Sequence, residues 1–480
     1  MRINQLIILL FVSSSLMFAV NPVGDFVNNK LLVNANISLL VKDLNSGKTL
    51  YDFRSKNSTV PASTMKLVTT ATALELLGPD FHFETKLEID GKIDNQGVLN
   101  GNLIIRGGGD PTLGSEKLGD PDFLNKWILE VKKAGISKIK GQIIADAGLY
   151  NEEGVNPFWT WEDIGNYYAA GVYGISYLDN SCRVFFRSGN VGTTPEIIRI
   201  NPVIPGLTFE NHLLSTKIGF DSCYFYGAPH LNLRSIYGEI PANRVEFSVK
   251  CDIPNPALLL AQDLTKVLIE NKIDVVGQAS DIVPAKYTSK IIFSHLSPPL
   301  SEIVKETNIK SNNHYAEQIF RYLALKDNSI ASTAGAIKVI KSFWNSKGLD
   351  VDQLYQYDGC GLSPLDAVSA EFFVDLLTYM RTKSQNKEVF FNSLPVSGET
   401  GTLVDFLSKS TLQGKVHAKS GTIARVKCYA GFIDIKGKNY VFAVMVNNAN
   451  GNSKAVTKKI EDFLLKISTS PKRLKKSKLK

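Results

Sequence analysis

Strand and helix patterns at the two ends of the chain enclose a long segment with a different pattern, and this arrangement constrains the fold most strongly. Near the N-terminus, Ile37–Lys42 and Thr49–Phe53 have the composition of strands, joined by the turn Asn45-Ser46-Gly47-Lys48. A helix is expected over about Ser63–Leu77, where Gly78-Pro79 ends it. Apolar residues surround most of its circumference, so this helix should be buried.

The C-terminal end supplies further elements of the same kind. Three strands are expected at Gly414–Ser420, Cys428–Ile435 and Asn439–Asn447, and a short turn joins the last two. A final helix follows, with apolar residues on one face, which is typical of a helix packed on a sheet: Val456, Ile460, Phe463, Leu464 and Ile467.

Between these ends, the segment from about His82 to Thr288 has short alternating runs separated by Gly, Asn and Pro. This pattern predicts β-rich structure with one or two helices, such as Pro121–Ala134. Helical periodicity returns in residues 298–323 and 329–347. We therefore expect an α/β fold in which residues 20–82 and 289–470 form one split domain and residues 83–288 form a large β-rich insertion.

The N-terminus has the features of a targeting segment. Arg2 precedes the apolar run Leu6–Val12, and small residues follow before Ala19. The run is much shorter than the roughly 20 apolar residues that span a bilayer, so residues 1–19 are predicted to be a secretory signal peptide. A buried strand is the alternative. Export would place the protein in the periplasm or cell envelope.

The net charge of +8 is concentrated at the C-terminus. Residues 471–480 hold six basic residues and no acidic one, so the rest of the chain carries about +2. A nearly neutral body does not favour nucleic-acid binding. The basic tail is either a solvated end or a loose attachment to anionic lipid or cell-wall polymer.

Cysteine and histidine spacing gives no metal signature. The five cysteines include no CxxC pair, and the six histidines form no HExxH motif, so neither a metal nor another cofactor is expected. An odd cysteine count in an exported protein leaves at least one thiol unpaired or intermolecular. Cys182, Cys223 and Cys251 lie in one region and could supply one disulfide, whose pairing stays open.

The first motif with chemical meaning is Ser63-Thr64-Met65-Lys66, at the start of the expected buried helix. Residues three apart share a helix face, so the Ser63 hydroxyl and the Lys66 amine can meet. A serine is a weak nucleophile until a base takes its proton, and a lysine can be that base when burial lowers its pKa. A helix-start serine with a surface lysine is the alternative, but a lysine in an apolar helix would be costly without a partner.

Two further motifs supply complementary groups. Ser311-Asn312-Asn313 stands before a helix, where a hydroxyl can relay a proton and the Asn313 amide can both donate to a substrate carbonyl and hold Lys66; a simple helix cap is the alternative. Lys419-Ser420-Gly421-Thr422 ends a strand, where small residues let a substrate approach and the lysine can attract a carboxylate; a basic turn is the alternative.

The order SxxK, SxN, KSG resembles that of the serine acyl-transferases that include penicillin-binding proteins and β-lactamases. The long gap between Ser63 and Ser311 resembles the class C low-molecular-mass penicillin-binding proteins, the D-alanyl-D-alanine carboxypeptidase/endopeptidase family (peptidase family S13). Further phrases agree with this family: residues 60–66, 107–113, 159–163, 311–317, 358–363, 394–398, 401–403 and 418–422. The chain departs from it at Ser420, often Thr, and at Cys360, usually Ser or Asn-like.

This resemblance implies a transpeptidase-like domain, an antiparallel sheet with helices on both faces, interrupted by a β-rich insertion. It implies that Ser63 is the nucleophile, Lys66 its base and Ser311 a proton relay. Substrate would be bound by Asn313 and by residues of the third motif (Lys419, Ser420, Gly421 and Thr422), and the backbone N–H groups of Ser63 and Thr422 would bind the oxyanion. The expected partners are peptidoglycan stem peptides and β-lactams.

The 159–163 segment adds a candidate specificity residue. In the family this region belongs to the insertion and overhangs the site, so Asp163 could contact the free amine of a diamino acid in a stem peptide; a surface acid is the alternative. Two other functions remain open: a serine β-lactamase and a catalytically silent peptidoglycan-binding scaffold. The balance of carboxypeptidase and endopeptidase activity and the oligomeric state also remain open.

Overall fold

The computed structural model describes residues 21–151, 154–285, 288–327, 330–435 and 437–469. The predicted signal peptide and the basic tail both lie outside the described residues. Within the described residues, no helix is both long enough and apolar enough to cross a membrane.

Strands from both ends of the chain form one antiparallel sheet, as the sequence predicted. Its order is β2-β1-β22-β21-β20. The strands are β1 (Asn36–Asp43), β2 (Thr49–Phe53), β20 (Val416–Ile423), β21 (Val426–Ile435) and β22 (Lys438–Asn447). The pairing of β1 with β22 extends from Asn36 opposite Asn447 to Asp43 opposite Tyr440. An N-terminal strand is therefore paired along its whole length with a C-terminal one.

Helices cover both faces of this sheet. Successive side chains of a strand point to opposite faces, and here the side chains on both faces are apolar. Leu39 and Val41 pack with α1 (Pro22–Val27) and α10 (Ser453–Thr469), whereas Leu40 packs in a second core with the remaining helices. Those helices are α2 (Lys66–Leu77), α5 (Leu300–Lys310), α6 (Asn313–Leu323), α7 (Thr333–Ser346), α8 (Ala370–Thr382) and α9 (Lys387–Asn392).

The helix expected at Ser63–Leu77 begins as a short 3-10 turn, Ala62–Met65, and continues as α2. Every residue from Lys66 to Leu74 is buried, so the helix is enclosed on all sides, as its apolar residues around most of the circumference predicted. Gly78 ends the helix with a φ of 89°, a conformation that favours glycine.

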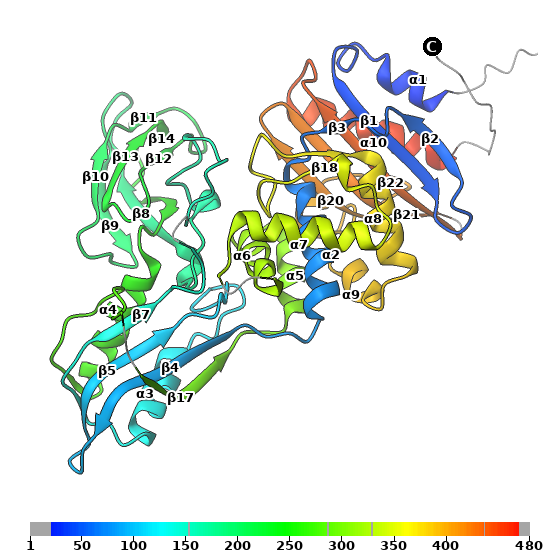
Figure 1. Cartoon of the computed structure of the whole chain (residues 1–480). Coiled ribbons are helices and arrows are strands. Elements are labelled where there is room, and N and C mark those ends of the chain that lie inside the picture. The colour runs from blue at the N-terminus through cyan, green and yellow to red at the C-terminus, as the bar shows by residue number, and fades with distance from the viewer. Residues whose placement is uncertain (1–20, 152–153, 286–287, 328–329, 436, 470–480) are drawn as a thin grey trace, which may run out of the picture.

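Residues 84–296 form a second assembly, which we call the inserted region. Its largest sheet contains β4 (Glu84–Ile93), β5 (Val98–Arg106), β6 (Lys138–Ile139), β7 (Ile143–Asp146), β16 (Asp274–Val275) and β17 (Ser289–Leu296). Figure 1 shows the chain entering this region along β4 and returning along β17. Because β17 pairs with β4, the sheet extends to Leu296, beyond the predicted boundary at residue 288.

Helices α3 (Phe123–Lys133) and α4 (Pro256–Glu270) pack on this sheet. Smaller sheets complete the inserted region, formed by β8 (Ser181–Arg187), β9 (Glu196–Asn201), β10 (Thr208–Asn211), β11 (Leu214–Thr216), β12 (Tyr224–Tyr226), β13 (Leu233–Tyr237), β14 (Glu239–Pro241) and β15 (Phe247–Asp252). A further small sheet outside it joins β3 (Ser58–Thr59), β18 (Leu354–Tyr355) and β19 (Ala367–Ser369).

The inserted region contacts helix α6 through hydrogen bonds. The Tyr150 hydroxyl donates to the Gln318 carbonyl at 2.9 Å, and Gln318 Nε2 donates to the Tyr173 carbonyl at 2.7 Å. The hydroxyls of Ser115 and Tyr315 lie 2.8 Å apart. Helix α6, which carries the SxN motif, is therefore fixed from the side of the inserted region.

The cysteines of the inserted region are all buried. Cys182 on β8 stands directly opposite Cys251 on β15, and their Sγ atoms are 2.7 Å apart as thiols. Of the three cysteines considered from the sequence, this is the pair that the fold brings together, whereas Cys223 precedes β12.

Candidate active site

The SxxK motif forms a serine–lysine pair at the start of α2. Ser63 lies in the 3-10 turn and is half-buried, while Lys66 is completely buried. Lys66 Nζ donates to Ser63 Oγ at 3.0 Å, so the contact expected from the three-residue spacing is present. This distance suits proton transfer between the two side chains.

Burial and hydrogen bonding determine the state of Lys66. Its Nζ also donates to Asn313 Oδ1 and to the Cys360 carbonyl, each at 2.7 Å. Burial lowers the pKa of Lys66 below its usual value of 10.5, while nearby Cys360 and buried carboxyl groups act in the opposite direction. A lysine with a lowered pKa is easier to deprotonate and hence better suited to act as a base.

The SxN motif joins two helices and brings Asn313 to Lys66. Ser311 ends α5 with a left-handed φ of 59°, and Asn312 caps α6 by accepting from the Tyr315 N–H. Asn313 is the first residue of α6, where its Oδ1 accepts from Lys66 and its Nδ2 donates to the Tyr168 carbonyl at 2.9 Å. Both ends of this amide are therefore oriented in the structure.

The KSG motif on β20 supplies a second serine–lysine pair. Lys419 Nζ donates to Ser311 Oγ at 2.9 Å and to the Ser420 carbonyl at 2.8 Å. Burial lowers the pKa of Lys419 well below its usual range, and the charges of Lys66 and Lys427 lower it further. The charge of Lys66 therefore influences the protonation of Lys419 across the site.

Strand β20 comes close to the turn that carries Ser63 at Gly421. A Cβ added to Gly421 would lie 2.4 Å from the Pro61 carbonyl oxygen and 3.2 Å from Ser63 N. The hydroxyl of Ser420 donates to Thr402 Oγ1 at 2.8 Å, and the exposed Thr422 accepts from Lys427. The three sequence motifs thus meet around Ser63.

Asp163 is linked to this site through Tyr168. Its carboxylate accepts from the Thr160 hydroxyl at 2.6 Å. Burial raises the pKa of Tyr168, and the charge of Asp163 and its hydrogen bond with the phenol raise it further. The carbonyl of the same Tyr168 holds Asn313. Asp163 therefore lies on the segment of the inserted region that reaches the site.

A buried group of acids behind Lys66 was not identified from the sequence. Asp358 accepts from the backbone N–H groups of residues 360–363 and from the indole N–H of Trp159. Burial and then nearby Asp358 raise the pKa of Glu317 to about 8, and the same causes raise that of Asp366 well above its usual range. The Asp-Gly-Cys-Gly pattern was a signal for a loop folded around a carboxylate. The carbonyls of Tyr168 and Cys360 carry no such signal.

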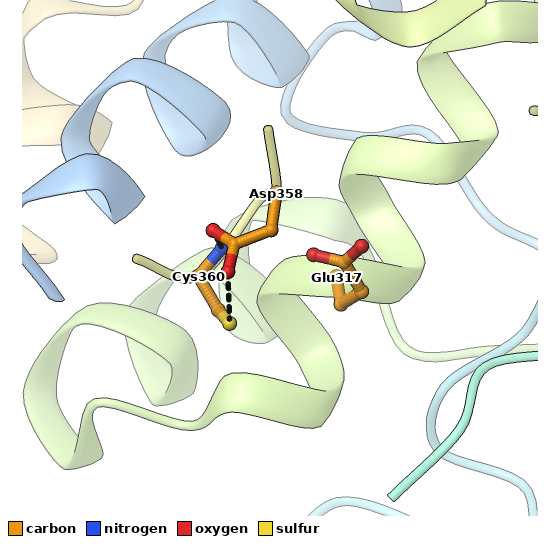
Figure 2. A group of neighbouring side chains, drawn as sticks. All are labelled: Glu317, Asp358 and Cys360. Carbon is orange, nitrogen blue, oxygen red and sulfur yellow. Dashed lines mark hydrogen bonds between the residues drawn. The ribbon is translucent and has the colours of Figure 1, made fainter. Parts of the chain in front are cut away.

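Part of this group also has the composition of a cation site. Figure 2 shows Glu317, Asp358 and Cys360 close together, and their potential ligand atoms lie within 4.8 Å of one another. The donor set does not suit a metal, since Asp358 accepts N–H bonds at both oxygens and Glu317 accepts from Asn156 and Gly359. The raised pKa of Glu317 and the N–H bonding of Asp358 account for the cluster.

The chain matches the model of the D-Ala-D-Ala carboxypeptidase 3 (S13) family over residues 21–469. It is 27% identical to the D-alanyl-D-alanine carboxypeptidase DacB of Haemophilus influenzae, covering 94% of each chain. It is 26% identical to a D-alanyl-D-alanine carboxypeptidase of an Actinomadura species, covering 88% of this chain and 79% of that protein.

The fold agrees with these matches. The crystal structure of penicillin-binding protein 4 from Haemophilus influenzae superposes with a TM-score of 0.81 at 24% identity, covering 94% of this chain and 98% of that one. The predicted fold, a penicillin-binding-protein-like α/β domain with a large insertion, is confirmed. The family model extends over nearly all of the described residues, and the chain therefore belongs to the D-Ala-D-Ala carboxypeptidase (S13) family.

Proposed function

We propose that this protein is a serine D-alanyl-D-alanine carboxypeptidase that acts on peptidoglycan stem peptides through an acyl-enzyme at Ser63. One observation carries the proposal: the buried Lys66 amine lies 3.0 Å from Ser63 Oγ. Burial favours the neutral amine, which is the form that can accept the serine proton. Membership of the S13 family supports the substrate class.

In the acylation step, Ser63 Oγ bonds to the carbonyl carbon of the penultimate D-alanine as its proton passes to Lys66. The backbone N–H groups of Ser63 and Thr422 stabilise the resulting oxyanion. The C–N bond then breaks as Ser311 gives its proton to the leaving amine of the terminal D-alanine and takes up the proton that Lys66 accepted, which leaves Lys66 neutral again. The hydrogen bond that Lys419 donates to Ser311 supports this relay, because it orients the Ser311 hydroxyl.

In the deacylation step, water attacks the ester carbon and gives its proton to Lys66. The ester bond then breaks, the product carboxylic acid leaves, and Lys66 returns the proton to Ser63 Oγ. Asn313 positions the substrate amide, with its own amide oriented by Lys66. Lys419 and Ser420 bind the terminal carboxylate, beside the strand that Gly421 brings close to the nucleophile. A bound carboxylate would favour the charged form of Lys419 and offset the effect of burial on its pKa.

A fluorescent penicillin should label the protein covalently, because its strained amide replaces the D-Ala-D-Ala bond in the acylation step. Labelling should disappear in Ser63→Ala. No label on the wild-type protein, or persistent label on Ser63→Ala, would refute the acyl-enzyme mechanism. Rapid turnover of the penicillin would favour a β-lactamase, and release of D-alanine from a pentapeptide would exclude a silent scaffold.

Cleavage of D-configured cross-links would be a second activity of the same site. Release of D-alanine from a pentapeptide should be compared with cleavage of a cross-linked dimer; no dimer cleavage would restrict the enzyme to carboxypeptidase activity. Asp163 is the candidate contact for the free amine of a diamino acid in the stem. An equal loss of activity by Asp163→Ala on substrates with and without that amine would defeat this assignment.

The same function accounts for the predicted location in the periplasm or cell envelope, since the substrate lies there. The basic residues 471–480 would attach the enzyme loosely to anionic lipid or cell-wall polymer, at roughly 1 kcal/mol per basic residue near an anionic membrane. If deletion of residues 471–480 leaves salt-dependent recovery with membranes unchanged, the tail has no such role.

A further inference from the structure

Lys66 has a third hydrogen-bond acceptor, the Cys360 carbonyl. The loop that contains Cys360 sets the position of this carbonyl. This carbonyl lies 2.7 Å from Lys66 Nζ, as close as Asn313 Oδ1. Both acceptors orient the amine toward Ser63. The position of Cys360 is therefore part of the geometry of the proposed base, although its side chain has no part in the chemistry.

A carboxylate at the centre of the loop fixes that position. Asp358 Oδ1 accepts from the N–H groups of Cys360 and Gly361, and Oδ2 accepts from those of Leu362 and Ser363 at 2.9 and 2.8 Å. The side chain of Asp358 is fully buried. The loop is therefore folded around this carboxylate, and Figure 2 shows the Cys360 thiol hydrogen-bonded to it.

The inserted region holds the same carboxylate from the other side. Trp159 is 5% exposed, and its Nε1 donates to Asp358 Oδ2 at 2.8 Å. Three residues earlier, Asn156 Nδ2 donates to the Tyr357 carbonyl at 2.8 Å and to Glu317 Oε1 at 3.1 Å. One short segment of the inserted region thus contacts both the loop and helix α6.

The setting makes the indole N–H hard to replace. Without the indole N–H, Asp358 Oδ2 still accepts from the N–H groups of Leu362 and Ser363, but these donors belong to the loop and move with it. The indole N–H ties the carboxylate to the inserted region instead. Water has little access, because Asp358 is completely buried. The least costly response is a shift of the loop, which would carry the Cys360 carbonyl with it.

We propose that Trp159 is a positioning residue for the catalytic base: its indole N–H anchors Asp358, and the loop folded around Asp358 presents the Cys360 carbonyl to Lys66. The inserted region then contributes to the chemical step as well as to the surroundings of the site. This inference rests on the proposed function, because it takes Lys66 as the base for Ser63.

The test is Trp159→Phe, which keeps an aromatic ring in the cluster with Val155, Ala169 and Ala316 but removes the N–H. With a fluorescent penicillin, we expect the acylation rate constant at saturation to fall about 10- to 100-fold. The dissociation constant of the initial complex should change less than threefold. A rate constant measured on the labelled fraction does not depend on how much of the variant folds.

The matched control is Trp127→Phe on α3. Trp127 is also buried in the inserted region, but among the described residues its indole N–H has no hydrogen-bond partner. Trp127→Phe should acylate at the wild-type rate. Equal rate constants for Trp159→Phe and Trp127→Phe would overturn the proposal, and so would a Trp159→Phe defect confined to the dissociation constant.

A double-mutant cycle separates positioning from general loss of structure. If Trp159 acts through Asp358, Asp358→Asn should be slow, and adding Trp159→Phe should slow it less than twofold further. Multiplying effects would overturn the proposal. The pH dependence of acylation should also shift in Trp159→Phe, because the groups around Lys66 (Cys360, Asp358, Glu317, Asp366 and Lys419) would be rearranged. Labelling of Ser63→Ala would instead refute the proposed function itself.

Discussion

Gly421 offers the sharpest test of how the site is assembled. It lies on β20, where the strand passes the turn that carries Ser63, and its missing side chain permits the approach. Gly421→Ala should slow acylation strongly without abolishing folding. The reason is local: its backbone is extended as part of a strand, so alanine introduces contact rather than a forbidden φ.

The size of the effect follows from the contact. The added Cβ would lie 2.4 Å from the Pro61 carbonyl oxygen, whereas ordinary van der Waals contact begins at 3.4 Å. The strand or the turn must therefore move by about 1 Å, which separates Ser63 N from Thr422 N. A displacement of that size in a catalytic site costs about 100-fold in rate, or roughly 2.7 kcal/mol.

The assay is the rate constant for labelling by a fluorescent penicillin, with thermal unfolding measured in parallel. Gly219→Ala is the matched control, because an added Cβ there meets nothing within 4 Å. It should label at the wild-type rate. A Gly421→Ala enzyme that labels within about threefold of wild type would refute the view that this close approach sets the geometry of the oxyanion site.

Three further predictions concern protonation, stability and thiols. The acylation rate should rise with pH as Lys66 becomes neutral and level off below pH 10.5, because burial lowers its pKa from that value; a rise centred at or above 10.5 in stopped-flow labelling would contradict this. Arg234→Met should cost about 3–5 kcal/mol in denaturant unfolding, since it leaves the Asp252 carboxylate without its buried partner at 2.7 Å; a cost below 1 kcal/mol would refute it. Mild oxidation should join Cys182 to Cys251, and peptide mapping that finds Cys223 in the bond instead would be the contrary result.

The sequence predicted the elements whose residues repeat with a regular period. Helix α2 could be predicted because apolar residues surround most of its circumference and Gly78-Pro79 ends it, and the terminal strands because turn residues separate them. The contact between Ser63 and Lys66 followed from helical spacing alone. The pairing of β1 with β22 needed the resemblance as well, because no local pattern tells one strand which distant strand it joins.

The support of Lys66 could not be predicted for a different reason. Its acceptors include the backbone carbonyl of Cys360. Every residue has a backbone carbonyl, so the sequence does not indicate which one binds Lys66. The same holds for Tyr168, whose carbonyl fixes Asn313. Trp159 could equally have been a core aromatic, and only the direction of its indole N–H distinguishes it.

The pairing of β1 with β22 also has a consequence for the order of folding. The ribosome makes β1 early, but its partner ends at Asn447, so the central sheet cannot close until almost the whole chain has been synthesised. The inserted region has its own apolar core, built from residues between Leu87 and Phe293, and can condense first. Such widely separated partners make closure slow. The surroundings of the proposed nucleophile are therefore completed last, and a chain truncated before β20 would contain Ser63 and Lys66 without the strand that packs beside them.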